Sequence, residues 1–354
     1  MIGPKIALDI SPTLNQNAQR GVGFYTSHLQ TALLSELKNN PLYKNWHLDL
    51  INNQQIQSPF SYNLIHYPFF DPFALTLPSR QHIPIIVTVH DLVPRLFKKD
   101  FPVGLKGEIT WLRQLHQLKK VDYIITDSHT SKYAINKVTG IKLDKIYTIY
   151  LAADPIYRPI KSLKLLEKVK KKFNLPEKFI LYTGDINVNK NIPLLVNACL
   201  KLKYPLYIVG ASAVKKTIEH PWTKDLVWLQ NQSSPLINRL GFVESIDLAG
   251  LYNLATIYCQ PSFAEGFGLG MLEAMQSGCP VVYSQDTSLE EIADNSGLSF
   301  NPYDQSSLQR TLQTIWSDKK QQNILRQQEL KRASHFSWQQ TALQTLAVYQ
   351  LALL

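Results

Sequence analysis

The sequence predicts an α/β protein made of two doubly wound halves, each built on a parallel sheet. Short runs rich in β-branched and aromatic residues alternate along the chain with longer amphipathic segments, as expected for sheets covered by helices. The chain has 354 residues, which suits two domains better than a single core. Pro155 and Pro159 stand near 155–165, where a linker between two halves is expected.

In the first half, apolar runs predict strands and amphipathic periodicity predicts helices. The first strand begins directly in the N-terminal segment "MIGPKIALDI", which lacks the long apolar stretch of a signal peptide. Helices are expected at 26–37, 105–120 and 128–138, the last with a serine or threonine cap. The expected strands are 5–10, 64–68, 85–91, 123–128 and 146–152.

The second half repeats the scheme. Helices are expected at 191–202 and 244–255, and the tail 336–354 has helical periodicity with one apolar face. The tail follows the second half but need not belong to it. The expected strands are 178–185, 206–212, 238–243, 257–262 and 280–285.

Composition and cysteine usage predict an ordered protein of the cytoplasm, either soluble or peripheral on the inner face of the plasma membrane. Hydrophobic residues make up 45% and charged residues 18%, and no apolar run approaches the roughly 20 residues of a membrane span. Cys199, Cys259 and Cys279 are scattered through apolar surroundings and are odd in number. They are expected to be buried free thiols in a reducing compartment.

The segment 263–275, "FAEGFGLGMLEAM", combines two carboxylates with three glycines. The glycines disfavour a helix before Gly268, so we expect Glu265 on a loop and Glu273 on a helix that ends at Gly278. The N-terminus of such a helix attracts an anion, and flanking carboxylates suit sugar hydroxyls. The pattern alone equally allows a tight turn with two exposed glutamates.

Two further positions carry candidate chemistry. His90 follows the apolar run "IPIIVTV", and ligands of open α/β sheets lie beyond the carboxyl ends of strands. Taken alone, it is better explained as a hydrogen-bonded histidine at a strand end. Lys190, in "NVNKN", would suit a diphosphate, but alone it is better explained as an exposed lysine at a helix start.

The formal charge of +10 predicts an anionic partner. Seven Lys or Arg residues and two acids lie between Arg95 and Lys120, a local balance of +5, with Phe97, Phe101 and Trp111 among them. We expect this segment, 95–120, to contact an anionic membrane surface or a lipid-linked acceptor. A solvated helix face is the equal alternative. Nucleic acid is not expected, because no binding module is recognisable.

The segment 258–304 resembles the nucleotide-sugar motif of retaining glycosyltransferase family 4, with its E-x7-E pair and "EAM..G.PVV" helix and strand. The resemblance covers most of the chain and includes "IALDI", "RGVGFYT", "VTVHDLVP", "YIITDSHTSKYAI", "YLAADPIYRP", "LYTGDINVNKNIPLLV" and "HFSWQQTA".

The resemblance implies the GT-B fold, in which two Rossmann-like doubly wound domains face each other across a cleft and a C-terminal helix returns to the N-terminal domain. The acceptor-side domain would comprise 1–158 and 338–354, and the donor-binding domain 159–337.

The resemblance also implies roles for individual residues. Glu265 would bind hydroxyls of the transferred sugar and Glu273 those of the ribose. Lys190 would contact the diphosphate, and His90 the sugar near its anomeric centre. Backbone contacts are expected from the loop glycines Gly21 and Gly23 to the diphosphate, from Phe267, Gly268 and Leu269 to sugar and phosphate, and from the region of Gly241 to Val243 to the base.

The chain departs from the family pattern at three positions. Many relatives have an arginine at the position of Asn189, and some instead have one at that of Asp185, so one cation is missing unless Arg239 or another basic residue replaces it. Gly270 stands where proline is frequent. Asp9 and Arg20 are further candidates for lining the site.

The implied function is retaining transfer of a hexose, with a mannose-like sugar favoured, from a GDP- or UDP-linked donor to a glycan or lipid-linked acceptor in the assembly of cell-surface polysaccharide such as lipopolysaccharide. No cofactor and no metal are expected. The carboxylates would bind the donor rather than act as acid and nucleophile. The alternatives are a non-catalytic nucleotide-sugar-binding partner subunit and a nucleotide-sugar epimerase. A glycan phosphorylase is disfavoured, because it would need a larger chain.

Overall fold

The computed structural model describes residues 3–15, 21–52, 61–78, 83–214 and 220–354, and it divides into two compact units. Unit 1 comprises Met1–Leu96, Val103–Ala152 and Phe336–Leu354, and unit 2 comprises Phe97–Pro102 and Ala153–His335. Each unit contains one six-stranded sheet in which every pairing is parallel. The predicted α/β fold of two doubly wound halves is confirmed.

The sheet of unit 1 has the strand order β2-β1-β3-β4-β5-β6. Ala7 in the central strand β1 lies opposite Asp49 of β2 and Ile65 of β3. The strands are β1 (Lys5–Asp9), β2 (His47–Ile51), β3 (Leu64–Tyr67), β4 (Ile85–Thr88), β5 (Tyr123–Thr126) and β6 (Ile146–Thr148).

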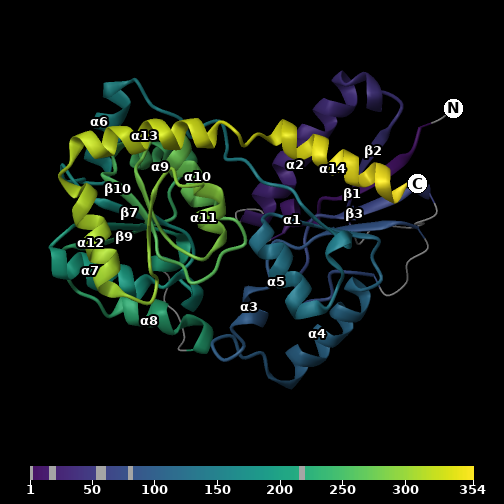
Figure 1. Ribbon diagram of the computed structural model, residues 1–354, viewed down its shortest axis with the longest axis horizontal. Coiled ribbons are helices and arrows are strands. Elements are labelled where there is room, and N and C mark those ends of the chain that lie inside the picture. The colour runs from purple at the N-terminus through teal and green to yellow at the C-terminus, as the bar shows by residue number, and fades with distance from the viewer. Residues whose placement is uncertain (1–2, 16–20, 53–60, 79–82, 215–219) are drawn as a thin grey trace. The chain divides into compact units, whose positions relative to one another are not determined.

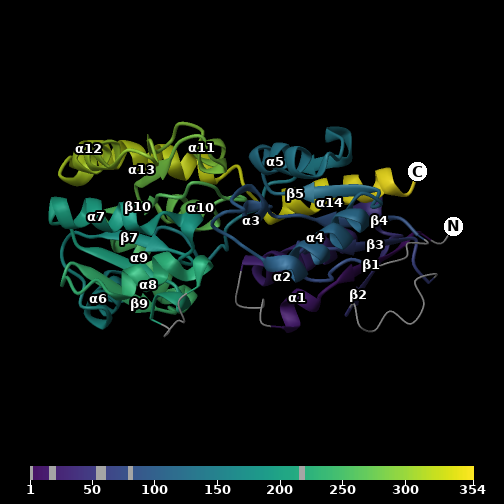
Figure 2. The ribbon, with the colours of Figure 1, turned by 90° about the horizontal axis from the view of Figure 1, so that it is seen from below.

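Helices cover both faces of this sheet. Figure 1 shows α4 and α5 on one face and α2 and α14 on the other. In the view of Figure 2, α4 lies in front of the sheet. Ile65 and Val87 pack with Trp111 of α4 in the core of the first face. The helices are α1 (Ser11–Leu14), α2 (Gly21–Asn39), α3 (Val93–Leu96), α4 (Gly104–Leu118), α5 (His129–Thr139) and α14 (Trp338–Ala352).

The tail helix α14 belongs to unit 1, as the fold prediction required. It packs along α2 (Figure 1). Its residue Tyr349 is fully buried and places its hydroxyl 2.7 Å from Nδ1 of His66 in β3. Trp338 stacks on His28 of α2 with ring centroids 5.0 Å apart. The apolar face seen in the sequence therefore completes the core of the first unit.

The sheet of unit 2 has the order β12-β11-β10-β7-β8-β9. Its strands are mostly fully buried, as is usual when both faces of a parallel sheet are covered. The strands are β7 (Ile180–Thr183), β8 (Leu206–Val209), β9 (Ile237–Gly241), β10 (Ile257–Gln260), β11 (Val281–Ser284) and β12 (Leu298–Phe300).

Figure 1 shows α7, α8 and α12 on one face of this sheet and α9, α10 and α13 on the other. The first face packs Ile180 and Ile208 against Leu195, Leu229 and Leu312 from the three helices. The helices are α6 (Leu163–Lys172), α7 (Ile192–Leu202), α8 (Lys224–Gln230), α9 (Ser245–Leu254), α10 (Leu269–Ser277), α11 (Ser288–Ala293), α12 (Gln305–Trp316) and α13 (Lys319–Ala333).

The unit boundary differs from the predicted one between 158 and 159. The segment 153–158 belongs to unit 2, because Gln276 Nε2 donates to the carbonyl oxygens of Asp154 (2.9 Å) and Tyr157 (2.7 Å). The segment 97–102 was assigned to the first domain and belongs to unit 2 as well. There Trp222 Nε1 donates to Pro102 O (2.9 Å), and Asp100 lies 2.8 Å from Lys224 Nζ.

Two expectations from composition are met within the described residues. Cys199, Cys259 and Cys279 are free and buried. None of the described helices is long and apolar enough to cross a membrane.

Candidate active site

Glu265 lies in the loop between β10 and α10, and three side chains donate hydrogen bonds to its carboxylate. Lys190 Nζ lies 2.8 Å from Oε1 and 2.6 Å from Oε2. Gln260 Nε2 and Ser262 Oγ donate to Oε1 at 2.7 and 2.6 Å. The Glu265 side chain is only 8% exposed, so its charge needs this pairing. The structure thus joins two residues that the sequence had placed on different parts of the donor.

The loop around Glu265 is fastened from both sides. Phe263 N donates to Asn189 O (2.7 Å), and Asn189 Nδ2 donates to Ala264 O (3.1 Å). On the other side, Ser288 Oγ lies within hydrogen-bond distance of Glu265 O (3.0 Å) and Phe267 O (3.2 Å). Asn189, at the position where the resemblance led us to expect an arginine, therefore holds the loop in place.

Helix α10 begins at Leu269 and is ended by Gly278, as predicted. Gly268 precedes it with φ of +107°, which glycine adopts readily. A Cβ on Gly268 would lie 2.3 Å from Leu289 Cδ2, and one on Gly270 would lie 2.6 Å from Thr183 Oγ1. These two glycines therefore let the helix start approach the protein interior. No side chain among the described residues caps this N-terminus, which suits a phosphate.

Glu273, on the first turns of α10, is buried, so the alternative of an exposed glutamate is wrong. Burial raises the pKa of its carboxyl to about 8, although the Tyr252 hydroxyl, which donates to Oε2 at 2.8 Å, opposes the shift. Glu273 is therefore largely protonated at neutral pH. A protonated carboxyl can both donate and accept, which suits a pair of ribose hydroxyls.

A chain of hydroxyl and amide groups connects Glu273 with Glu265. The Thr183 hydroxyl lies 2.9 Å from that of Tyr252 and 3.3 Å from that of Tyr258. Tyr258 donates to Gln260 Oε1 at 2.9 Å, and Gln260 in turn donates to Glu265. Burial raises the pKa of both tyrosines well above 10, so their hydroxyls keep their protons.

The sequence analysis missed Thr183, Tyr252, Tyr258 and Gln260. Each lies in or next to a strand or helix where its pattern is that of a core residue. A polar residue at the last position of a buried strand, as Thr183 and Gln260 are in β7 and β10, was the available signal.

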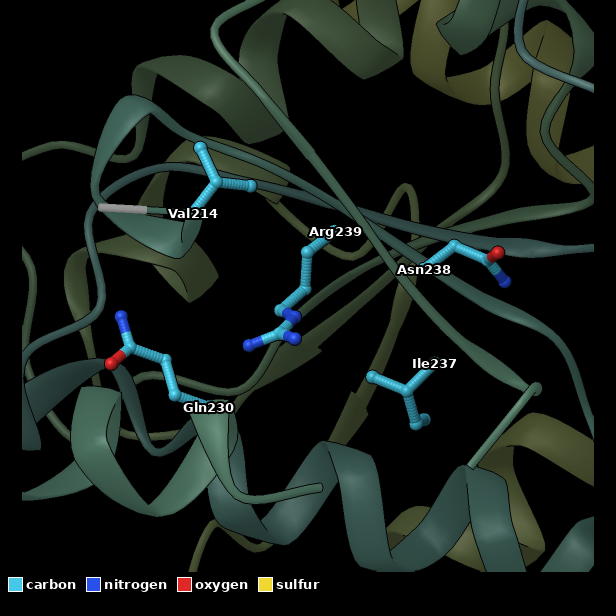
Figure 3. A pocket seen from close by; sticks show the side chains of 5 residues that line it. All are labelled: Val214, Gln230, Ile237, Asn238 and Arg239. Atoms are coloured by element: carbon cyan, nitrogen blue, oxygen red, sulfur yellow. The ribbon is translucent and has the colours of Figure 1, made fainter. Parts of the chain in front are cut away.

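At the end of β9, the region assigned to the base contains Gly241 with φ of +72° and the buried Val243. Arg239 was the residue expected to replace the missing cation. Figure 3 shows its guanidinium between the side chains of Gln230 and Ile237, in a pocket of about 380 Å³ that Val214 and Asn238 also line. No described contact joins it to the Lys190–Glu265 pair, so the proposed replacement is not seen in this structure.

In unit 1, His90 follows β4 by two residues and has acceptors at both ring nitrogens. Nδ1 lies 2.7 Å from Asp127 Oδ2, and Nε2 lies 3.2 Å from Pro68 O. Burial lowers the pKa of His90, but the charge and hydrogen bond of Asp127 outweigh it, so that the net pKa is raised. The two acceptors stabilise the imidazolium, which can donate from both nitrogens, relative to the neutral ring.

A buried polar network lies behind His90. The ring of Tyr25 stands edge-on to it at 4.8 Å, and the Tyr25 hydroxyl lies 3.1 Å from Thr88 Oγ1. Thr88 is 2.9 Å from Nε2 of His66, whose pKa burial lowers to about 3. His66 is therefore a neutral, structural histidine. Asp127 and this network were missed, although "YIITDS" places Asp127 at a strand end just as "VTVHD" places His90.

Gly21 and Gly23 are not in a loop. Both belong to the first turn of α2, which begins five residues before the predicted helix start at 26. Asp9 accepts a hydrogen bond from the backbone of Ser11 at 3.0 Å. Arg20 lies outside the described residues.

The segment 95–120 differs from the expected basic and aromatic surface. Arg95 is buried and lies 2.7 Å from Glu108, and Phe101 and Trp111 are 4% exposed. The helical period of α4 turns Trp111 inward, so that Leu105 (79% exposed) and Leu112 (62% exposed) face outward instead.

Comparison with known proteins agrees with this architecture. The model of a family described as glycosyl transferases group 1 matches residues 164–332, and one described as glycosyltransferase family 4 matches 22–156. Each match falls in one of the two halves, and together they cover most of the chain. Sucrose-phosphate synthase from Thermosynechococcus elongatus has a similar structure, with a TM-score of 0.76 and 19% identity over 98% of each chain. Anabaena HepE, solved in complex with UDP-glucose, gives a TM-score of 0.72 with 16% identity, over 98% of this chain and 99% of HepE. The fold is therefore GT-B.

Two curated relatives from Escherichia coli are mannosyltransferases by name. The serotype-specific mannosyltransferase WbdA is 28% identical over 77% of this chain and 34% of its own length. The O-antigen chain mannosyltransferase B is 31% identical over 68% of this chain and 63% of its own length. The chain thus matches about a third of the first protein and under two thirds of the second.

We predict that Asp127→Asn lowers the pKa of His90 by about one unit or more, because the charge that favours the imidazolium is removed. Titration of the histidine ring signals by NMR measures this. Ser131→Ala is the matched control, because Ser131 Oγ donates to the backbone oxygen of His90 and does not contact the ring. An unchanged pKa in Asp127→Asn would contradict the assignment.

We predict that Glu273→Gln removes a pH dependence of stability. With a folded-state pKa of about 8 against an ordinary 4.5, the stabilising proton of Glu273 is fully bound below pH 4.5 and lost as pH rises through 8. The free energy of unfolding of the wild type, relative to the variant, should therefore fall between pH 5 and 8 by up to about 1.4 kcal/mol per pH unit. Urea denaturation at several pH values measures it. Glu177→Gln, at an exposed position, is the control and should show the same pH dependence of the unfolding free energy as the wild type. If the unfolding free energy of Glu273→Gln depends on pH in the same way as that of the wild type, the prediction is refuted.

Proposed function

Because this chain belongs to the glycosyl transferases group 1 and glycosyltransferase family 4 lineage, we propose that it transfers a sugar from a nucleotide-diphosphate sugar to a glycan or lipid-linked acceptor. The transfer would retain the anomeric configuration, and the sugar would be a hexose of mannose type. The role would lie in the assembly of cell-surface polysaccharide, in the cytoplasm. The mannosyltransferase names of the relatives support the sugar, and the UDP-glucose complex of HepE supports a nucleotide-sugar donor.

The observation that carries the proposal is the arrangement around the start of α10. The Lys190–Glu265 pair, the uncapped helix N-terminus and the buried Glu273 lie on adjoining segments of unit 2. A cation and the amides of a helix N-terminus suit a diphosphate. A carboxylate and a protonated carboxyl on either side suit the hydroxyls of a sugar and a ribose.

In the proposed reaction, the bond from the anomeric carbon to the phosphate oxygen breaks while the acceptor oxygen bonds to the same carbon. The acceptor proton passes to the leaving phosphate. Lys190 and the amides of Phe267, Gly268 and Leu269 would stabilise the charge that builds on that phosphate. His90 would contact the sugar near its anomeric centre, and Val243 and its neighbours would contact the base.

Glu265 suits binding better than nucleophilic attack. Its two oxygens already accept hydrogen bonds from Lys190, Gln260 and Ser262, which lowers its reactivity toward carbon. The protonated state of Glu273 likewise removes a second nucleophile at neutral pH. This supports a path without a covalent sugar–protein intermediate, in contrast to a retaining hydrolase. We propose that no metal or cofactor takes part.

We further propose that α4 and its neighbours in segment 95–120 touch an anionic membrane surface or the lipid of the acceptor. The outward cations Lys106, Arg113, Lys119 and Lys120 support this. The exposed leucines of α4 add apolar surface beside them.

We predict that the protein releases nucleotide from at least one of a panel of UDP-, GDP- and ADP-sugars, GDP-mannose included, and equally fast with and without EDTA. His90→Ala should lower kcat about a hundredfold, and Lys190→Ala by a similar factor or more. Glu273→Gln should raise the KM of the donor and leave kcat less affected.

The exposed Lys201→Ala, at the end of α7 far from Lys190, serves as the control for Lys190→Ala. Full activity of all three site variants would refute the site assignment. Binding of a nucleotide sugar without turnover would favour a non-catalytic partner subunit, and isomerised donor without transfer would favour an epimerase.

We predict that the protein sediments with vesicles that contain phosphatidylglycerol and not with pure phosphatidylcholine vesicles, and that 0.5 M salt weakens the binding because exposed charges are screened. Lys119→Gln combined with Lys120→Gln should reduce the bound fraction, whereas Lys201→Gln should not. Absence of binding even at low salt would remove the membrane contact from the proposal.

A further inference from the structure

A groove of about 590 Å³ lies in unit 1 between residues 73–75 and the outer face of α4. Its apolar lining includes Phe73, Leu75, Leu105 and Ile109, and its polar lining includes Lys106 and Arg113. All of these residues come from one unit and from two segments whose backbones are described throughout. The groove shares no residue with the His90 network or with the cluster around Glu265.

Helix α4 is apolar on two faces. Its inner face buries Trp111 and Leu118 in the core of the sheet. On its outer face Leu105, Ile109 and Leu112 follow one another at helical spacing and are 79%, 44% and 62% exposed. Leu75, across the groove, is 68% exposed. A run of exposed aliphatic side chains on a single helix face marks a binding surface more often than a solvated one.

The charge around the groove has one sign. Lys106 and Arg113 line it, and none of the described residues that line it is a carboxylate. Glu108, the one acid of α4, lies 2.7 Å from the buried Arg95 guanidinium and is neutralised by it. The groove therefore combines an aliphatic lining with two cations whose long side chains can reach outward. A second copy of this surface would bring like charges together, which disfavours self-association.

We propose that this groove binds one hydrocarbon chain of an anionic lipid, whose phosphate Lys106 and Arg113 contact. The inference deepens, and rests on, the proposed contact of segment 95–120 with a lipid surface. It differs from electrostatic adsorption to a membrane surface, because a preformed groove binds the hydrocarbon chain of a single lipid even when no bilayer is present. The lipid would hold unit 1 at the surface where a lipid-linked acceptor is found.

The test uses the full chain and dodecyl phosphate below its micelle concentration, so that only monomeric amphiphile is present. Isothermal titration calorimetry should detect binding to the wild type. Leu105→Ser combined with Ile109→Ser should weaken it at least tenfold through the loss of chain contacts. Lys106→Gln combined with Arg113→Gln should weaken it about tenfold through the loss of the phosphate contact.

Leu42→Ser is the matched control, because Leu42 is an 80% exposed leucine elsewhere on unit 1. It should bind like the wild type. Circular dichroism checks that the substituted residues, all on the surface, leave the fold intact.

Four outcomes overturn the proposal. The first two are binding of dodecyl phosphate by the Leu105/Ile109 variant that equals wild-type binding, and absence of binding by the wild type. The third is an equal affinity of the wild type for butyl phosphate, which would indicate an anion site alone. The fourth is a wild-type dimer that the Leu105/Ile109 variant converts to a monomer in sedimentation, which would indicate an interface between copies. Vesicle binding without binding of dodecyl phosphate would leave the membrane contact standing and remove the groove. Because no readout depends on turnover, failure of the proposed reaction is distinguishable from failure of the groove.

Discussion

A carboxylate that is almost withdrawn from solvent must have its charge matched, and much of unit 2 is arranged around that need at Glu265. Lys190 reaches it from the turn after β7, Gln260 from the end of β10, and Ser262 from the loop itself. Asn189 and Ser288 hold the backbone on either side. β7, β10 and β11 are neighbours in a parallel sheet, so their carboxyl ends deliver these groups to one place.

The hydroxyls of Tyr258, Thr183 and Tyr252 connect this cluster with Glu273, which is buried as well. Ionisation of a carboxyl in this buried position costs free energy. Glu273 is therefore protonated, and it accepts one hydrogen bond from Tyr252. Gly270 is part of the arrangement, because any side chain there would collide with Thr183 and Tyr258. The two glutamates are thus held in different charge states by a single connected set of neighbours. A ligand would meet groups whose positions are already fixed, which reduces the entropy lost on binding.

How far the sequence predicts this protein depends on whether a feature is local. The strands of both sheet centres, the limits of α10 and the free cysteines follow from nearby residues. The edge strands β2 and β12 were missed, because both are only partly buried and β12 has only three residues. The helices α12 and α13 were not singled out.

In the site, Glu265, Glu273, Lys190 and His90 were named, but their partners were not. The hydrogen bond from Asp127 to His90 spans 37 residues, and that from Lys190 to Glu265 spans 75, so no local pattern contains them. In segment 95–120, composition alone could not show that Arg95 and Trp111 turn inward.

The place of α14 has a consequence for the order in which the chain can fold during synthesis. The first unit contains the N-terminal residues, yet its core is completed by the fully buried Tyr349 of α14, which lies 2.7 Å from His66. The half-buried Trp338 stacks on His28. While the ribosome is still making unit 2, the face of the first sheet that α14 will cover stays uncovered and His66 lacks a partner for Nδ1. Unit 2 comprises Phe97–Pro102 and Ala153–His335, all of which precede α14 in the chain. The half that is translated first is therefore the half that matures last, and until then its open face is a natural substrate for a chaperone.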